Sequence, residues 1–376
     1  MPLANLAKKQ WFGYGDRFGS DITVRRGGNI LLLSDDDELA VQQEWQREAT
    51  ARYPDEIDAR ILRGRELNDL IPGADRRFVG ALHQPSDGSA EPTHAVPLIA
   101  KGARAEGVQV FAPVAVRGIE TAGGEIHSVV TELGEVRTKR VVLAGGAWSR
   151  MFLGNLGVDL PQQGVASPMM RVRGGTAMQG AGMGGDGAWR EEVGGTYSIG
   201  ATSHVIPVTL DSFRVLPAFL PALKQLVGDL PNSPLKLRIG SDLISSLRTP
   251  RRWSNGEVTE FERVRMLTGR PLPGAGESSL AAIQELFPDL RNAQIIERWA
   301  GIIDATPDYT SVISEVPQIP GLVLNTGHGA QGFSFGPGAG LLAAQIVAER
   351  APSIDLAPFR FERFSDGTRL QIREFI

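Results

Sequence analysis

The loop TGHGAQGFSF contains glycines at a spacing that lets a backbone approach a ligand closely. Gly327, Gly329 and Gly332 fit G-x-G-x-x-G between the apolar segment GLVLN and a helical segment that ends in AAQIVAER. Here backbone N–H groups and a helix N-terminus can face an anion or a polar ring. His328 lies inside the motif, where a hydrogen-bonded loop histidine is the alternative to a functional one. The spacing predicts a ligand-binding loop.

A second glycine turn, AGGAWS at 144–149, also follows an apolar strand. Its small residues permit close approach of the backbone to a cofactor, and Trp148 can pack on a ring. A tight turn with a core tryptophan is the alternative. Asp304 and Asp308 flank Thr306-Pro307 and can pass for an acid pair, but a turn capped by Asp side chains is the simpler interpretation.

A third glycine cluster contains Gly180, Gly182 and Gly185, with no apolar strand before it and no helix after it. This motif has a mechanism only between a strand and a helix, so we predict a mobile surface loop. The histidines outside the first loop have no metal-ligand spacing, so no metal site is predicted. The chain has no cysteine, which excludes disulfides, thiolate metal sites and a cysteine nucleophile.

The composition is that of a soluble globular protein, with 42% hydrophobic and 22% charged residues among 376. With 39 basic and 43 acidic residues the formal net charge is −4, which argues against nucleic-acid binding because phosphates attract positive surfaces. No apolar run reaches the roughly 18 residues of a membrane span. The first residues lack the apolar region of a signal peptide, so we expect no membrane span and a cytoplasmic location.

The elements that would position the glycine turns form an α/β unit over residues 97–145. A helix is expected to begin at Pro97 and to end before Gly107. Residues 108–111 are expected to form a short strand, followed by a hairpin around Gly123-Gly124 and a strand leading into the AGGAWS turn. Upstream, residues 21–33 read as a hairpin or a bulged strand, and a helix is expected from the three Asp residues at 35–37 to about Arg52.

Residues 160–270 predict a mostly antiparallel sheet that can form one wall of a pocket. The expected strands are TYSIGATSHV, PLKLRIG and LISSLRT, and the expected helices of this region and the next are LPAFLPALKQLVGDL and SSLAAIQELFPDL.

In their order along the chain, six segments resemble the FAD-dependent oxidoreductases of the D-amino-acid oxidase type. That family includes glycine and sarcosine oxidases, D-amino-acid dehydrogenases and the β-subunits of proline and hydroxyproline dehydrogenases. The segments are DITVRRGGNILLL, DGSAEPTHAVPLIAKGARAEGVQVF, VVLAGGAWSR, RWAGIIDATPDYTSVIS, GLVLNTGHGAQGFSFGPGAGLLAAQIV and DLAPFRFERF.

The resemblance implies an α/β fold of mixed α+β character. A Rossmann-like FAD-binding domain would be assembled from residues 95–152 and 318–350. A substrate or cap domain, with the large mostly antiparallel sheet, would comprise residues 20–94 and 153–317, and residues 351–376 would be a C-terminal extension. The resemblance also implies FAD as cofactor, with these residues near it: Val116, Ala144, Gly145, Trp148, Gly327, Gly329, Ala330, Gln331, Gly332 and Phe333.

The chain departs from the family pattern in two places. The family begins with a strand, a G-x-G-x-x-G turn and a helix that hold the ADP half of FAD, and this pattern would start roughly 60 residues before Met1. An N-terminally truncated sheet would expose apolar surface, so we expect a second chain or subunit to cover it. Ile303 and Ala330 occupy places where the amino-acid oxidases have a basic residue, so the family's carboxylate clamp is missing. Other cations that can replace it are Arg298, Arg251, Arg252 and His328.

The resemblance implies FAD-dependent oxidation of an amino or imino acid by hydride transfer to flavin N5, and the missing clamp favours a secondary or cyclic amine as substrate. His328, Gln331 and Arg298 are the candidate catalytic residues. Such chemistry depends on positioning more than on a strong base. The alternative is a flavin-free remnant or partner subunit that acts as an interaction module.

Overall fold

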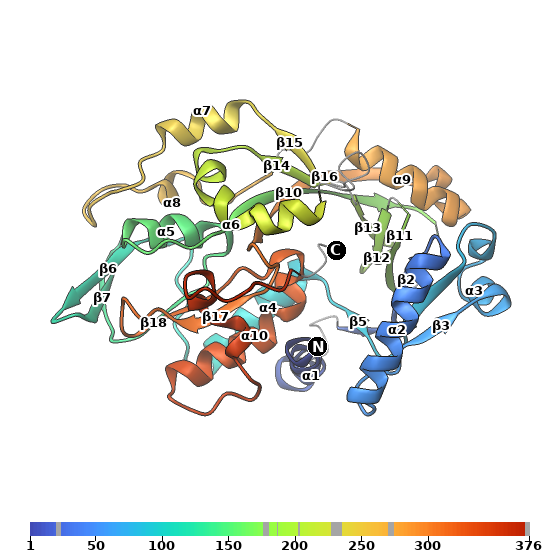
Figure 1. Ribbon diagram of the computed structural model, residues 1–376, viewed down its shortest axis with the longest axis horizontal. Helices are drawn as coiled ribbons and strands as arrows, with labels where there is room; N and C mark the ends of the chain where they lie inside the picture. Colours follow the sequence, from blue (N-terminus) through green and yellow to red (C-terminus); the bar gives the residue numbers. More distant parts are fainter. Residues whose placement is uncertain are drawn as a thin grey trace.

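The computed structural model describes residues 1–19, 24–175, 180–185, 187–201, 204–226, 235–269 and 274–372. A large sheet spans one side of the molecule and smaller sheets with their helices lie below it (Figure 1). This is the mixed α/β architecture that the sequence predicts. Among the helices of the described residues, none combines the length and the hydropathy needed to cross a membrane.

Within the part of the chain that the structure describes, the large sheet has ten strands. Nine follow the order β15-β14-β10-β13-β12-β11-β2-β4-β3, and the tenth, β16, pairs with β10. Most neighbours are antiparallel, as predicted; β11 with β2 and β14 with β15 are parallel. The strands are β2 (Asn29–Leu33), β3 (Arg60–Leu62), β4 (Gly80–Gln84), β10 (Gln163–Arg173), β11 (Ala181–Gly184), β12 (Gly187–Glu191), β13 (Thr196–Ala201), β14 (His204–Pro207), β15 (Leu235–Arg238) and β16 (Gln294–Ala305).

The two faces of this sheet have different coverings. Met170 and Val172 of β10 pack with Leu280 and Ile283 of α9 (Ala275–Leu286) in the main hydrophobic core. Because successive side chains of a strand alternate between faces, Arg171 lies on the opposite face. That face, called the inner face here, is turned toward α4 (Pro92–Ala105) and α10 (Gly332–Val347) (Figure 1).

The second sheet carries the glycine turns. Its order is β17-β18-β9, with β17 (Val312–Glu315) antiparallel and β9 (Val141–Leu143) parallel to β18 (Leu322–Thr326). Helices α10 and α1 (Pro2–Phe18) pack together beside it, so closely that a Cβ on Gly338 would lie 2.9 Å from the backbone nitrogen of Ala7. The second segment of the predicted flavin domain begins at residue 318, and β17 ends just before it. The domain limits themselves stay a prediction.

A separate meander of β6 (Val116–Ala122), β7 (Glu125–Thr131) and β8 (Gly134–Arg137) confirms the predicted hairpin. Gly123 and Gly124 have φ of 64° and 86°, which L-residues with side chains rarely adopt. The remaining helices are α2 (Asp36–Arg52), α3 (Gly64–Leu70), α5 (Ser149–Asn155), α6 (Leu210–Leu226), α7 (Ser241–Arg248) and α8 (Glu260–Arg263). The prediction of α2 is confirmed, and Asp35 caps it by accepting from the N–H of Glu38 at 2.8 Å.

Two predicted elements between residues 92 and 111 differ from the structure. Helix α4 begins at Pro92, so Pro97 lies inside it rather than at its start. A proline at the start of a helix is favoured, and the sequence pattern placed Pro97 there. In the structure Pro92 has that position instead. Residues 108–111 form no strand, and Val108 and Phe111 are 53% and 66% exposed. A strand needs a paired neighbour, and no described strand lies beside this segment.

The segment LISSLRT, predicted as a strand, is helix α7. Leu243, Ile244 and Leu247 recur at the spacing of a helix rather than at the alternation of a strand. The sequence predicts β structure on both sides of Gly27-Gly28, as a hairpin or a bulged strand. In the described part both β stretches are present, but they do not pair with each other. Strand β1 (Arg25–Arg26) pairs with β5 (Gly88–Ser89), whereas β2 pairs with β4 and β11 in another sheet. Residues 21–23 lie outside the described residues.

The Gly180 cluster is not a surface loop, because β11 lies inside the large sheet. A Cβ on Gly182 would lie 2.4 Å from the Trp189 ring, and one on Gly184 would lie 2.3 Å from the Leu32 Cβ. These glycines are required for close packing between strands rather than for a ligand. The neighbouring residues 176–179 and 186 of this predicted loop lie outside the described residues.

Candidate active site

Two glycine turns meet at one edge of the β17-β18-β9 sheet. In the parallel pair, Leu324 of β18 lies opposite Leu143 of β9, so both strands end at the same edge. The turn after β9 contains the 3-10 helix Gly146–Trp148, and the turn after β18 contains the 3-10 helix Gly329–Gln331. The carboxyl ends of adjacent parallel strands are where open α/β sheets bind ligands.

Asp304 holds the second turn in place from the end of β16. Its carboxylate accepts hydrogen bonds from the backbone N–H of Gly327 at 2.7 Å and of Gly329 at 3.1 Å. Burial raises the pKa of Asp304, and the N–H donors of the turn oppose that rise. The sequence predicts a turn around Thr306-Pro307 that is capped by Asp side chains. Asp308 accepts from the N–H of Thr310 at 3.2 Å there, whereas Asp304 caps the turn after β18. The sequence could not show that Asp304 caps a turn more than 20 residues downstream.

A buried polar network joins the two turns. Ser149 Oγ donates to Thr326 Oγ1 at 2.9 Å, and Thr326 Oγ1 lies 3.2 Å from the carbonyl oxygen of Gly146. Gln162 Nε2 donates to Thr326 Oγ1 at 3.2 Å and to Asp304 at 3.3 Å. Sequence reasoning did not assign a role to Ser149 or Thr326, although they lie at the ends of the two glycine motifs, and it missed Gln162, which lies in no motif. The network fixes the relative position of the turns because each buried member has a partner.

His328 forms a hydrogen bond within the turn region, with Nδ1 2.9 Å from Ser311 Oγ. Burial lowers the pKa of His328 from 6.5 to about 4. The imidazole is therefore neutral at pH 7. In that form it can accept a hydrogen bond or donate one, but it supplies no positive charge for a substrate carboxylate.

Replacing His328 by Gln should change how the stability depends on pH. A histidine whose pKa is lower in the folded state stabilises the protein above pH 6.5, and this contribution is lost as the pH falls toward 4. We expect the parent protein to lose roughly 3 kcal/mol more than His328→Gln between these pH values. Urea unfolding at a series of pH values measures this. Parallel profiles for the parent and the variant would contradict it.

Each of the two turns has open space beside one of its glycines. Gly146 and Gly329 have φ of 53° and 62°, and a Cβ on either would meet no atom within 4 Å. Gly327 also has positive φ, but a Cβ there would lie 2.6 Å from Thr306 Cγ2. The space beside Gly146 and Gly329 is what close approach of a flavin ring requires.

Other predicted cofactor residues have varied surroundings. Ala144 is exposed at the end of β9, and Val116 begins β6 with 38% exposure. The Trp148 ring packs edge-on against Phe261, with centroids 5.2 Å apart, inside an aromatic cluster. The Phe333 ring packs against Trp11 of α1 at 4.8 Å. The structure thus brings glycines 145–146 close to residues 327–332, which include His328. The Phe333 ring, in contrast, points toward α1.

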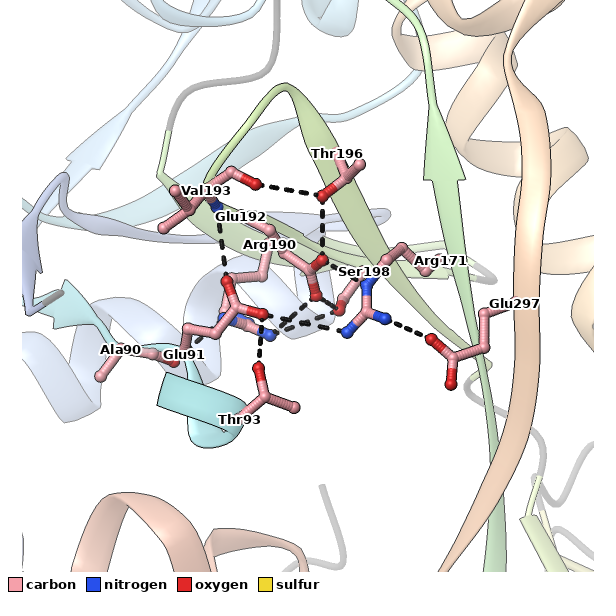
Figure 2. A network of polar contacts seen from close by, with 10 residues as sticks. All are labelled: Ala90, Glu91, Thr93, Arg171, Arg190, Glu192, Val193, Thr196, Ser198 and Glu297. Carbon is pink, nitrogen blue, oxygen red and sulfur yellow. Dashed lines mark hydrogen bonds and ion pairs between the residues drawn. The ribbon is translucent and has the colours of Figure 1, made fainter. Parts of the chain in front are cut away.

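The inner face of the large sheet carries a network of charges (Figure 2). Arg171 Nε donates to Glu192 Oε2 at 2.6 Å, and the same guanidinium contacts Glu297 and lies 3.9 Å from Glu91. Arg190 donates to Glu192 at 3.2 Å and to the carbonyl oxygen of Ala90, just before α4. Thr93, Val193, Thr196 and Ser198 complete the contacts shown. The network connects the sheet to the start of α4. Within it, the Arg171 guanidinium is paired with the carboxylates of neighbouring glutamates.

Three arginines named from the sequence lie away from the inner face. Arg298 is on the face that α9 covers and pairs with Glu277 of α9 at 3.2 Å, so it does not join His328 and Gln331. This correction follows from strand alternation, because Arg298 lies opposite Met170 of the α9 core. Arg251 and Arg252 lie beside α5 and α6, where Arg251 contacts Asp211.

Comparison with known proteins identifies the family of this chain. Residues 1–346 match the family model DAO, described as FAD dependent oxidoreductase. The structure of L-amino acid deaminase from Proteus myxofaciens in complex with anthranilate superposes with a TM-score of 0.91 at 36% identity, covering 97% of this chain and 81% of that chain. Glycine oxidase from Pseudomonas aeruginosa is 28% identical over 352 residues, or 92% of this chain and 77% of the relative.

Sarcosine oxidase subunit beta from an Arthrobacter species is 26% identical over 317 residues, or 83% of this chain. The chain spans 64% of the length of that relative. The family match covers most of the chain, including both glycine turns and the strand that carries Asp304. The chain therefore belongs to the DAO family of FAD-dependent oxidoreductases.

Proposed function

We propose that this protein oxidises an amino or imino acid, with a secondary or cyclic amine favoured, by hydride transfer from the α-carbon to flavin N5. The observation that carries the proposal is the pair of glycine turns fixed together by Asp304 and Thr326, with open space beside Gly146 and Gly329. Bound there, FAD supplies the hydride acceptor. The residues of this chain position the substrate and form the walls around it.

The inner face near the turns supports the preference for a cyclic or secondary amine. Ile303 and Trp299 of β16 lie on the same face as Met169 of β10, so apolar contact is available there. One arginine on this face, Arg171, is already engaged by Glu192 and Glu297. A substrate that gains binding energy from ring carbons suits this wall better than one held mainly by its carboxylate.

In this proposal His328 and Gln331 position the substrate at the flavin edge. The neutral imidazole of His328, held by Ser311, can accept or donate a hydrogen bond without introducing a charge. Gln331 ends the 3-10 helix Gly329–Gln331, and its side-chain amide can both donate and accept a hydrogen bond. Arg298 has no part in the proposal because its guanidinium pairs with Glu277 on the other side of the sheet.

Gly329→Ala should weaken flavin retention at least tenfold, because the new methyl group occupies the space beside the turn. No protein atom lies within 4 Å of that methyl group, so the fold itself is strained only through φ. Gly73→Ala is the matched control, since Gly73 has φ of 87° and equally open surroundings far from the turns. The measurement is flavin per folded protein after gel filtration. Equal flavin content in both variants would remove Gly329 from the site.

The proposed reaction is tested by a visible spectrum followed by a substrate panel. We expect a flavin absorption band that is bleached without oxygen by proline derivatives or sarcosine faster than by glycine or D-alanine. A band bleached fastest by glycine would contradict the substrate preference alone. A colourless folded protein that cannot be loaded with FAD would favour the flavin-free interaction module instead.

We also propose that a second chain covers the outer edge of β9. Within the described residues β9 is paired only with β18, and its Val142 is 40% exposed. An unpaired apolar edge strand is a template for another strand. Sedimentation velocity should show a mass above the 40.5 kDa of one chain, and Val142→Lys should reduce it. A parent protein that stays monomeric at every concentration would contradict this proposal.

A further inference from the structure

A pocket of about 400 Å³ lies beside α5, apart from the glycine turns. Its walls come from α5, from the start of α6 and from the segment around residue 251, and its apolar lining includes Met151 and Val158. Ser149, the first residue of α5, points to Thr326 of the flavin-side network, whereas the next residue, Arg150, lines this pocket. One helix thus separates two sites.

The charges in this pocket do not balance. Its lining contains four arginines and two aspartates, which leaves a net charge of +2 in a chain whose net charge is −4. Asp211 is surrounded by three of the arginines: its carboxylate contacts Arg251 and lies 3.5 Å from Arg150 Nε and 3.8 Å from Arg214 Nη1. Asp159 is 81% exposed and pairs with Arg150 at 2.8 Å. The two aspartates cannot neutralise four guanidinium groups.

Two of the guanidinium groups also have donors that no hydrogen bond satisfies. The Nε of Arg251 is buried without a hydrogen-bond partner among the described residues, and the Nε of Arg150 has only the 3.5 Å ion pair with Asp211. The side chains of Arg150 and Arg251 are 11% and 22% exposed, so water reaches them poorly. Leaving a buried donor unpaired is costly, and an oxyanion in the pocket would offset the positive charge of these two guanidinium groups.

We propose that this pocket binds a phosphate monoester through Arg150, Arg214, Arg251 and Arg252. A phosphate group carries a charge of nearly −2 at pH 7 and matches the excess of +2. Planar guanidinium groups bind its oxygens in pairs. The pocket exceeds the volume of one phosphate ion, so there is room for a small organic group against Met151 and Val158. The site is separate from the flavin turns and does not depend on the proposed oxidation.

The test is isothermal titration of the full-length protein with inorganic phosphate, glycerol phosphate and succinate, against sodium chloride at equal ionic strength. We expect saturable binding of both phosphates, tighter for the monoester. Arg214→Gln combined with Arg252→Gln should weaken it at least tenfold; these two arginines are the exposed ones of the four. Arg65→Gln combined with Arg350→Gln removes the same charge from exposed positions outside the pocket and should bind as the parent does.

Flavin content should be the same in both double variants, which separates this site from the flavin turns. The proposal is overturned if phosphate binds no better than chloride, or if both double variants lose the same affinity. Tighter binding of succinate than of glycerol phosphate would overturn the assigned ligand class. A melting curve of each variant shows that the fold is intact, so a loss of binding cannot be ascribed to unfolding.

Discussion

Asp304→Ala should lower the affinity for flavin about 100-fold while the protein remains folded. Its carboxylate accepts from the backbone N–H of both Gly327 and Gly329, and each hydrogen bond to a buried charged group contributes about 1.5–3 kcal/mol. Without these bonds the turn loses the conformation that leaves space beside Gly329. Equilibrium dialysis of the apoprotein against FAD measures the affinity.

Two further variants make the Asp304 result specific. Asp304→Asn keeps one acceptor oxygen of the same shape and should show an intermediate loss. Asp355→Ala removes a carboxylate that also caps a backbone N–H, that of Ala357, at an exposed position of the C-terminal segment, and flavin affinity should not change. If Asp304→Ala binds FAD as tightly as Asp355→Ala does, the turn does not hold the flavin.

Arg363→Met should reduce the free energy of unfolding by about 3–5 kcal/mol, because it leaves a buried carboxylate without its partner. Arg363 donates to Asp308 at 2.8 and 3.1 Å and to the carbonyl oxygen of Thr310 at 2.7 Å. The two side chains are 3% and 5% exposed. This ion pair attaches the C-terminal segment to the turn that follows β16. Urea unfolding measures the loss.

The control for Arg363 is another arginine of the same segment. Arg360 pairs with Asp366 at 2.7 Å, but both side chains are more than one third exposed, so Arg360→Met should cost less than about 1 kcal/mol. Adding Asp308→Asn to Arg363→Met should restore part of the stability, because the unpaired charge is then absent. A loss for Arg363→Met no larger than that for Arg360→Met would contradict the role of the buried pair.

Local patterns were sufficient for several elements of the fold. The three Asp residues before Leu39 predicted α2, and Gly123-Gly124 predicted the β6–β7 hairpin, because helix capping and turn chemistry act between neighbours in the chain. The glycine spacing after β18 predicted a turn at a strand end for the same reason. The prediction of a strand at α7 was wrong because its apolar residues recur at the spacing of a helix.

Long-range contacts determined the rest of the candidate site. Residues 108–111 have the composition of a strand, but none of the strands that the structure describes lies beside them. Gly182 looked like part of a loop, although β12 and β2 lie on either side of it. The sequence also could not indicate that Arg298 faces α9 while Arg171 faces the inner side, because that depends on which face the core covers.

By itself, the sequence determined the two glycine turns and the mostly antiparallel sheet, since these follow from residue types and from spacings within one segment. The resemblance of six segments, taken in their order along the chain, indicated the family. Only the tertiary structure showed that Asp304, Gln162, Ser149 and Thr326 join those turns, and that four arginines gather beside α5. The physical reason is that a buried polar group takes whichever partner the packing brings within about 3 Å. Packing depends on the whole chain, so it cannot be predicted from the residues of one segment.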